Sequence, residues 1–320
     1  MSDFWHDIPG MRSRLDRVTS IMKDALSSSR FPLAEAVASL LDANGKMLRP
    51  AFLLLSGDFG RDTKSVETLA AAVELLHVAT LIHDDVIDCA DTRRGVRTLH
   101  VAFGPKDAVL AGDWLFSRCF QLAAESSNPD NARLLSALVA SICSEEIHQD
   151  LENFLWPESV RNYLRKIAGK TAALFSLALR AGAQEAKAPR PVIARLTRIG
   201  YDIGMAFQIM DDVLDYESTE GAMGKPVAKD LREGLATLPL ILALKSRGAD
   251  IRPLLGGEPL SGQAIESIVR LVRESGGPAK AQDHARRYTE RALGEIAALP
   301  AGPARDMLQK VTSKLLVRTR

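Results

Sequence analysis

Aromatic residues and cysteines are scarce in this chain of 320 residues. Phe, Trp and Tyr make up only 5% of it, and the three cysteines, Cys89, Cys119 and Cys143, form no closely spaced pair. An odd number of distant cysteines fits neither a disulfide framework nor a zinc site, which needs clustered ligands. The simpler expectation is a protein of a reducing compartment, the cytoplasm.

The sequence also lacks an excess of charge of either sign. Lys and Arg number 41 against 40 for Asp and Glu, so no basic surplus indicates nucleic acid as a partner. The N-terminus, MSDFWHDIPG, lacks the residue order of a signal peptide, and no uninterrupted apolar stretch reaches the ~20 residues that a bilayer span needs. Any function that depends on charge must therefore be local.

Strand-like alternation of apolar and polar residues is missing as well, whereas apolar residues recur at helical spacing almost everywhere. Turn residues such as Asn44-Gly45, Gly104-Pro105 and Gly276 to Pro278 divide the chain into about ten or more helices. None of these breaks is long or polar enough to be a linker. The sequence predicts an all-α fold in a single domain over residues 1–320.

Two short acidic motifs repeat one pattern. LIHDDVID ends at Asp88 and QIMDDVLD ends at Asp215, and each contains two adjacent aspartates, two apolar residues and a third aspartate. In a helix, Asp84 and Asp88 lie one turn apart on the same face, as do Asp211 and Asp215. Like charges at that spacing repel each other, so a cation is needed to offset them. Because the pattern recurs only once, it indicates two halves of one site rather than a solenoid repeat.

Carboxylate oxygens are hard ligands that favour Mg²⁺, which is usually held by one or two carboxylates together with substrate phosphates. A solvated acidic helix face is one alternative, and the apolar residues around both motifs argue against it. Another takes His83 and Asp84 as the metal pair of a helical phosphohydrolase. That interpretation needs more histidines on neighbouring helices, and the spacing of the six histidines gives it little support.

Basic residues follow the first motif and recur beside glycines. Arg93 and Arg94 come a few residues after three carboxylates, and an Arg fork binds two phosphate oxygens at once. A single Lys or Arg is more often a surface charge, but next to Gly the backbone can approach a ligand closely. The glycine segments lack the spacing of a P-loop, so ATP chemistry is not expected. The candidates beside glycines or helix boundaries are Lys46, Arg49, Lys170 and Lys225.

Six segments together resemble a known family. NGKMLRP, ELLHVATLIHDDVIDCADTRRG, GDWLFSRCF, GKTAALF, FQIMDDVLDY and GKPVAKDLREGLATLPL are similar, in order and spacing, to the head-to-tail trans-isoprenyl (polyprenyl) diphosphate synthases. The likeness runs from about Asn44 to Pro239. It implies a helical bundle of the isoprenoid synthase type around a deep central apolar cavity, usually as a homodimer. The implied reaction joins isopentenyl diphosphate to an allylic prenyl diphosphate and releases diphosphate.

The resemblance also implies the metal ligands. Mg²⁺ is the expected cofactor, with three ions in each active site when diphosphate is bound. Asp84, Asp88 and Asp211 are implied as direct ligands. Asp85, Asp212 and Asp215 are implied to act through water or neighbouring groups.

The substrate contacts implied by the family fall into two sets. Arg93, Lys170 and Lys225 would hold the allylic diphosphate with Thr171, and Gln208 would lie near the reacting carbon; of these, Arg93, Lys170 and Gln208 are the catalytic candidates. Lys46, Arg49, His77 and Arg94 would bind isopentenyl diphosphate. Two positions depart from the family pattern, because Met47 replaces a basic residue and Ala228 replaces a frequent glycine. Neither change removes an implied ligand.

The residues before the first motif bear on product length. In short-chain members a bulky aromatic residue commonly occupies the fourth or fifth position before the motif, where this chain has Thr80 and Ala79. Small residues would leave the cavity open towards Leu76. We therefore expect a long-chain product. The alternatives are a short-chain farnesyl or geranylgeranyl synthase, a class I terpene cyclase and a non-catalytic subunit of a heteromeric synthase. A peripheral membrane contact would serve product release.

Overall fold

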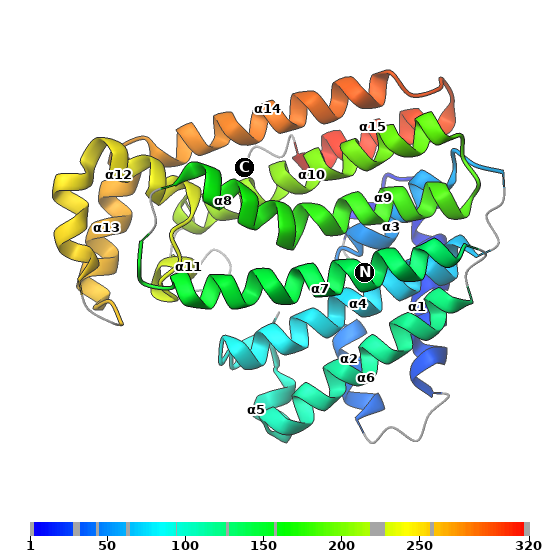
Figure 1. The fold of residues 1–320 in the computed structure, drawn as a ribbon, viewed down its shortest axis with the longest axis horizontal. Coiled ribbons are helices and arrows are strands. Elements are labelled where there is room, and N and C mark those ends of the chain that lie inside the picture. The colour runs from blue at the N-terminus through cyan, green and yellow to red at the C-terminus, as the bar shows by residue number, and fades with distance from the viewer. Residues whose placement is uncertain are drawn as a thin grey trace. The chain divides into compact units, whose positions relative to one another are not determined.

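The computed structural model describes residues 3–27, 33–42, 45–61, 65–93, 95–125, 128–156, 159–217, 228–256 and 259–316. These residues fold almost entirely into helices, which confirms the predicted all-α class (Figure 1). In chain order the first elements are η1 (Asp3–Trp5), α1 (Met11–Ser27), α2 (Ala34–Asp42), α3 (Leu48–Gly57), α4 (Val66–Ile87), β1 (Thr92–Arg93), β2 (Val96–Arg97), α5 (Leu99–Phe103), α6 (Pro105–Ala124) and α7 (Pro129–Glu152). The remaining elements are α8 (Val160–Ile167), η2 (Ala168–Ala172), α9 (Ala173–Glu185), α10 (Arg190–Glu217), α11 (Lys229–Arg232), α12 (Leu238–Ile251), η3 (Arg252–Leu255), α13 (Gly262–Glu274), α14 (Gly277–Ala297) and α15 (Pro303–Leu316).

Contacts between residues group the chain into two compact units, each assembled from three stretches. The first unit contains Met1–Ala137, Leu177–Thr197 and Leu299–Val311. The second contains Leu138–Ser176, Arg198–Ala298 and Thr312–Arg320. The first acidic motif belongs to the first unit and the second motif to the second unit. A single domain over 1–320 stays a prediction.

Helix α4 is the core of the first unit. Its sequence is apolar on nearly every side, and such a helix is stable in water only when it is surrounded. It packs against α1, α3 and most extensively against α6, which lies beside it in Figure 1. By length and composition α4 could cross a membrane, but 67% of its most apolar window is buried within the protein. Its polar end, from His83 to Asp88, carries the first motif.

A short antiparallel hairpin follows α4. Thr92 pairs with Arg97 and Arg93 pairs with Val96. Gly95 in the turn has φ of +78°, a conformation that glycine adopts without the strain a side chain would bring. Strands of two residues are too short to show an alternating pattern, so they could not be predicted from periodicity.

The second unit is built around α10 and α12. One cluster of buried side chains joins α8, η2, α10, α12 and α14. A second cluster joins α11, α12 and α13, and Tyr216 at the end of α10 belongs to it. In Figure 1, α14 runs beside α12, with which it is in extensive contact. The second acidic motif lies in the last turns of α10, between these two clusters of buried residues.

Candidate active site

Asp85 in the first motif is buried and is paired with an arginine. Asp85 is 4% exposed, and Arg93 of β1 donates from Nε to Asp85 Oδ1 at 2.6 Å. Burial raises the pKa of Asp85 above its ordinary value, although Arg93 acts in the opposite direction. The hairpin thus places the guanidinium of Arg93 against the end of α4, the helix that precedes it. This contact uses Nε of a guanidinium that has two further nitrogen donors.

The other two aspartates of the first motif face solvent to a greater degree. Asp84 is half-buried and Asp88 is exposed at the end of α4. The neighbouring His83 fixes this end of the helix against α6, because its Nε2 lies 3.0 Å from the carbonyl oxygen of Val109. A Cβ atom on Gly112 would lie 2.2 Å from the same Nε2. The glycine in GDWLF therefore makes room for the imidazole beside the first motif.

The implied isopentenyl diphosphate contacts lie on α4 and at the start of α3. His77 lies on α4, two turns before Asp84, and is half-buried. Lys46 is exposed just before α3, and Arg49 is half-buried in its first turn. The indole Nε1 of Trp5 donates to the carbonyl oxygen of Lys46 at 2.6 Å, which fixes the backbone there. Since α3 packs against α4, these basic residues belong to neighbouring helices of one unit.

In the second motif the buried aspartate has neutral partners. Asp212 is 3% exposed. Tyr163 of α8 donates to its Oδ2 at 2.6 Å, and Gln208 Nε2 donates to its Oδ1 at 2.8 Å. Burial raises the pKa of Asp212 to about 7, although these two hydrogen bonds lower it. Asp212 is thus held on both oxygens by side chains of the protein.

Asp215 supports the segment that follows α10. Its Oδ1 accepts from the backbone N–H of Lys229 at 3.1 Å, and its Oδ2 accepts from that of Asp230 at 3.3 Å. These contacts satisfy donors in the first turn of α11. Ala228, directly before that turn, has φ of +56°. This left-handed conformation explains why glycine would suit the position, and alanine there carries a steric cost of about 1 kcal/mol.

The segment GKTA forms a π-helical turn, η2, between α8 and α9. Lys170 in this turn lies 2.5 Å from Glu146 of α7, as an ion pair between Nζ and Oε1. Thr171 donates from Oγ1 to Gln208 Oε1 at 2.8 Å. Hydrogen bonds in the second unit therefore link Thr171, Gln208 and Asp212, and Lys170 is the residue directly before Thr171. Asp211 is exposed beside them on α10.

The residues implied for chain length lie on the buried part of α4. Ala79 and Leu76 have no exposed surface, and Thr80 is half-buried with its hydroxyl donating to the carbonyl oxygen of His77 at 2.8 Å. These side chains are therefore directed into the protein rather than to solvent. Arg94 and Lys225, both implied as diphosphate ligands, lie outside the described residues.

Comparison with known proteins decides the family. The profile of the polyprenyl synthetases matches residues 32–272, which is most of the chain. This chain belongs to the polyprenyl synthetase family. The predicted membership among the trans-isoprenyl diphosphate synthases is confirmed.

Individual polyprenyl synthetases are similar over nearly the whole chain. Heptaprenyl diphosphate synthase component 2 of Geobacillus stearothermophilus is 36% identical over 296 residues, which cover 92% of each chain. Nonaprenyl diphosphate synthase of Mycobacterium tuberculosis is 33% identical over 303 residues, covering 93% of this chain and 90% of that protein. A solved structure of geranylgeranyl pyrophosphate synthase from Lactobacillus brevis is 36% identical with a TM-score of 0.92 and 99% of both chains covered. The predicted prenyltransferase activity and the likeness to the long-chain branch are confirmed.

Magnesium dependence is general in the polyprenyl synthetases, and the carboxylates of this chain fit that ion. Within the described part of the chain, His, Cys, Asp and Glu side chains form no group of three or more that could hold a metal alone. Mg²⁺ suits such an open arrangement, because it keeps several waters and takes its remaining ligands from substrate phosphates. Asp88 and Asp211 are exposed, Asp84 and Asp215 are half-buried, and Asp85 and Asp212 are buried.

Three side chains around the motifs were missed by the sequence interpretation: His83 as a packing residue, Glu146 and Tyr163. Each acts on its partner across at least 24 residues of sequence. Glu146 lies within the long helix α7 and Tyr163 within the amphipathic helix α8, and only their tertiary neighbours distinguish them. The double Glu in SEEIHQ was the one visible signal for Glu146.

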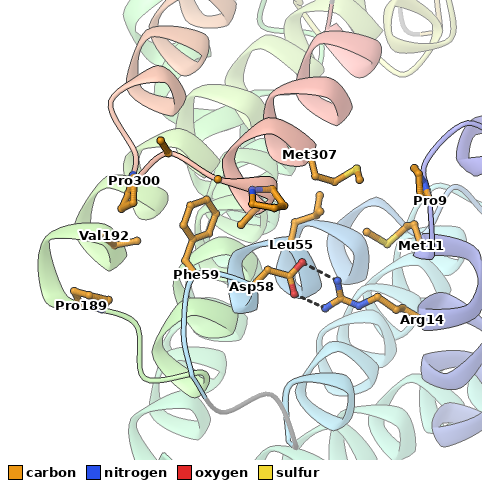
Figure 2. Close-up of a pocket in the computed structure, with 14 residues that line it drawn as sticks. Pro9, Met11, Arg14, Leu55, Asp58, Phe59, Pro189, Val192, Pro300 and Met307 are labelled. Atoms are coloured by element: carbon orange, nitrogen blue, oxygen red, sulfur yellow. Dashed lines mark hydrogen bonds and ion pairs between the residues drawn. The ribbon is translucent and has the colours of Figure 1, made fainter.

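A pocket of about 530 Å³ lies in the first unit, away from all of these residues (Figure 2). It is lined by apolar side chains such as Leu55, Phe59 and Met307. The charged group in it, Arg14, is engaged with both carboxylate oxygens of Asp58 at 2.8 and 3.0 Å, as the dashed lines in Figure 2 show. None of the predicted site residues lines this pocket, so it carries no part of the proposed reaction.

Proposed function

We propose that this chain joins isopentenyl diphosphate to an allylic prenyl diphosphate and makes a long-chain polyprenyl diphosphate. One observation carries the proposal. In each acidic motif one aspartate is buried and held by protein groups, and another, Asp88 or Asp211, is exposed to solvent. Basic residues suited to diphosphate lie in the same units as these carboxylates. Such a set binds a pyrophosphate through shared cations and through direct Lys and Arg contacts.

Asp84, Asp88 and Asp211 would hold the Mg²⁺ ions, with three ions in the complex with diphosphate. Bound Mg²⁺ supplies positive charge that stabilises the departing diphosphate. Lys170 and Arg93 add their own charge to the allylic diphosphate, which favours breaking of its C–O bond. The bonding electron pair leaves with diphosphate, and an allylic cation remains. The double bond of isopentenyl diphosphate then attacks this cation to form the new C–C bond.

The remaining residues orient the two substrates. Lys46, Arg49 and His77 would hold isopentenyl diphosphate, together with Arg94, so that its double bond faces the cation. Gln208 would lie near the reacting carbon with Thr171. The released diphosphate accepts the proton lost from the condensed product, so no dedicated side-chain base is required. Water must be excluded because it would capture the cation, which is why apolar residues beneath the motifs matter.

The buried surface of α4 would set product length. Ala79 and Thr80 are small, so a growing prenyl chain could extend past them towards Leu76. The relatives named for heptaprenyl and nonaprenyl products support this proposal. The neighbour named for a geranylgeranyl product keeps a short-chain synthase as the alternative. Replacing Ala79 with Tyr should shorten the product, as seen by reversed-phase analysis of dephosphorylated products, and an unchanged length distribution would exclude Ala79 from the cavity wall.

Two kinds of assembly are possible for such an enzyme, and we favour the homodimer. Phe103, Val109 and Leu110 at α5 and α6 are between 41% and 52% exposed, and an apolar surface of this kind suits a second copy of the chain. The relative named component 2 raises a second candidate, a chain that works with another polypeptide. Chromatography with light scattering, with and without substrates, distinguishes a dimer from a monomer.

The decisive experiment incubates the purified chain with labelled isopentenyl diphosphate, Mg²⁺ and each allylic primer in turn. We expect linear polyprenyl diphosphates and release of diphosphate. A cyclic hydrocarbon would identify a class I terpene cyclase instead. Turnover only after addition of a second polypeptide would identify a subunit of a heteromeric synthase.

A further inference from the structure

Tyr163 begins a chain of hydrogen bonds that ends in the π-helical turn. Its hydroxyl donates to Asp212 Oδ2 at 2.6 Å, Gln208 Nε2 donates to Asp212 Oδ1 at 2.8 Å, and Thr171 Oγ1 donates to Gln208 Oε1 at 2.8 Å. All four side chains belong to the second unit. The proposed reaction gives Tyr163 no direct part.

The chemistry of each group fixes the direction of the chain. Both oxygens of Asp212 accept hydrogen bonds, so Gln208 presents its Nε2 to Asp212 and its Oε1 to Thr171. Gln208 is only half-buried, and an amide without such neighbours could turn over and exchange its oxygen and nitrogen. Asp212 therefore sets which end of the Gln208 amide faces Thr171.

Asp212 itself needs an external constraint. It shares α10 with Gln208 at a spacing of four residues, so the helix alone allows the carboxylate to rotate. Tyr163 comes from a different helix, α8, and its ring is packed in the same core cluster as Ile209 and Val213. A buried ring has few accessible orientations, so its hydroxyl is a fixed reference point for the carboxylate.

We propose that Tyr163 is a positioning residue that fixes the side-chain amide of Gln208 through Asp212. This inference rests on the proposed function, because it assigns Gln208 to the reacting carbon. Tyr163 does not touch substrate. Its removal should therefore slow the chemical step while leaving the binding of isopentenyl diphosphate, assigned to α3 and α4, unaffected.

The test replaces Tyr163 with Phe, which removes one hydroxyl and keeps the ring. We expect kcat to fall about tenfold or more, the size expected for a hydrogen bond to a charged group, with KM for isopentenyl diphosphate unchanged within about twofold. Tyr288→Phe is the matched control, because its ring packs against the same cluster and it lies outside the chain of hydrogen bonds. The control should retain kcat within about twofold.

A second pair of variants separates positioning from a general loss of structure. In a Gln208→Leu background, adding Tyr163→Phe should change single-turnover rates by less than about twofold, because the group that Tyr163 positions is already gone. Independent, multiplicative effects of the two changes would overturn the inference, as would an unchanged kcat in Tyr163→Phe alone. If the wild-type chain forms no prenyl product at all, the proposed function fails, and the wild-type assay shows that result independently of any variant.

Discussion

The two acidic motifs have nearly the same sequence, but their buried aspartates are stabilised differently. Asp85 is paired with the guanidinium of Arg93, which the chain returns from a hairpin only eight residues later. Asp212 accepts hydrogen bonds from two neutral groups, and one of them, Tyr163, lies 49 residues away in sequence. The first motif is therefore assembled locally with a full charge, and the second by tertiary packing with dipoles. A shared pattern in sequence does not imply a shared means of support.

The largest expected effect is the loss of activity when an aspartate proposed to bind Mg²⁺, Asp84 or Asp211, is replaced, compared with replacement of the buried Asp85. Asp84→Asn and Asp211→Asn should lower kcat/KM by about 10³-fold, because each removes a charge proposed to hold Mg²⁺. Asp85→Asn should lower it by about 10- to 100-fold, as expected for a residue that supports a ligand. Initial rates over a range of Mg²⁺ concentrations test this order. Equal losses of kcat/KM in all three variants would contradict the proposal that Asp84 and Asp211 bind Mg²⁺ while Asp85 only supports them.

Variants of Arg93 and Tyr163 compare how much a charged and a neutral hydrogen-bond donor each stabilise a buried aspartate. Arg93→Met should destabilise the protein by about 2–3 kcal/mol, because Asp85 stays buried and loses its cation. Tyr163→Phe should cost about 1 kcal/mol, because Asp212 retains Gln208. Urea unfolding of both variants, followed by circular dichroism, measures the difference. A Tyr163→Phe variant as unstable as Arg93→Met would mean that the two kinds of support have equal weight.

Glycines that pack closely against neighbouring atoms allow a third comparison, of the stability lost when a methyl group is added in each unit. A Cβ atom on Gly204 would lie 2.5 Å from Cα of Ala172, whereas the atoms nearest to one on Gly112 belong to the imidazole of His83. Since backbone yields less than a side chain, Gly204→Ala should destabilise by about 3 kcal/mol and Gly112→Ala by about 1–2 kcal/mol.

Gly294 in α14 is the control for these glycines, because a Cβ atom there meets nothing within 4 Å. Gly294→Ala should stabilise the protein by about 0.5–1 kcal/mol through the lower helix propensity of glycine. Thermal unfolding of the three variants checks the order. A Gly204 variant as stable as wild type would show that η2 can move away from α10.

A small, pH-dependent effect concerns Asp202, a third buried aspartate. Arg291 lies 2.9 Å from its Oδ1, yet burial raises the pKa of Asp202 to about 6. A carboxyl with a raised pKa binds its proton more tightly in the folded state. Its contribution to stability is therefore complete below pH of about 4 and is lost as pH rises through about 6. Asp202→Asn should flatten the fall in stability across this range, by about 1 kcal/mol, in melting curves at pH 4 to 7. Parallel curves for variant and wild type would exclude Asp202 as the cause.

Much of the fold class and the family could be predicted from sequence, because both depend on local signals. Helical periodicity along the chain predicted the all-α fold, and the spacing within LIHDDVID and QIMDDVLD was enough to identify the two motifs. The partners of the buried aspartates could not be predicted. Tyr163 meets Asp212 only because α8 and α10 contribute to the same core, and no pattern within either helix records that contact. The left-handed conformation of Ala228 was not predicted either, although a frequent glycine in the family pattern at this position was a signal for it.

The π-helical turn at Ala168–Ala172 has a further consequence for how this part of the chain can change over time. Such a turn contains one residue more than regular α-helical winding needs. Loss of one residue there would restore regular winding without rotating the helix that follows, but it would shift the residues within the turn. Lys170 would then leave Glu146, and Thr171 would leave Gln208. A single-residue deletion here should therefore remove both contacts even though a continuous helix could still form.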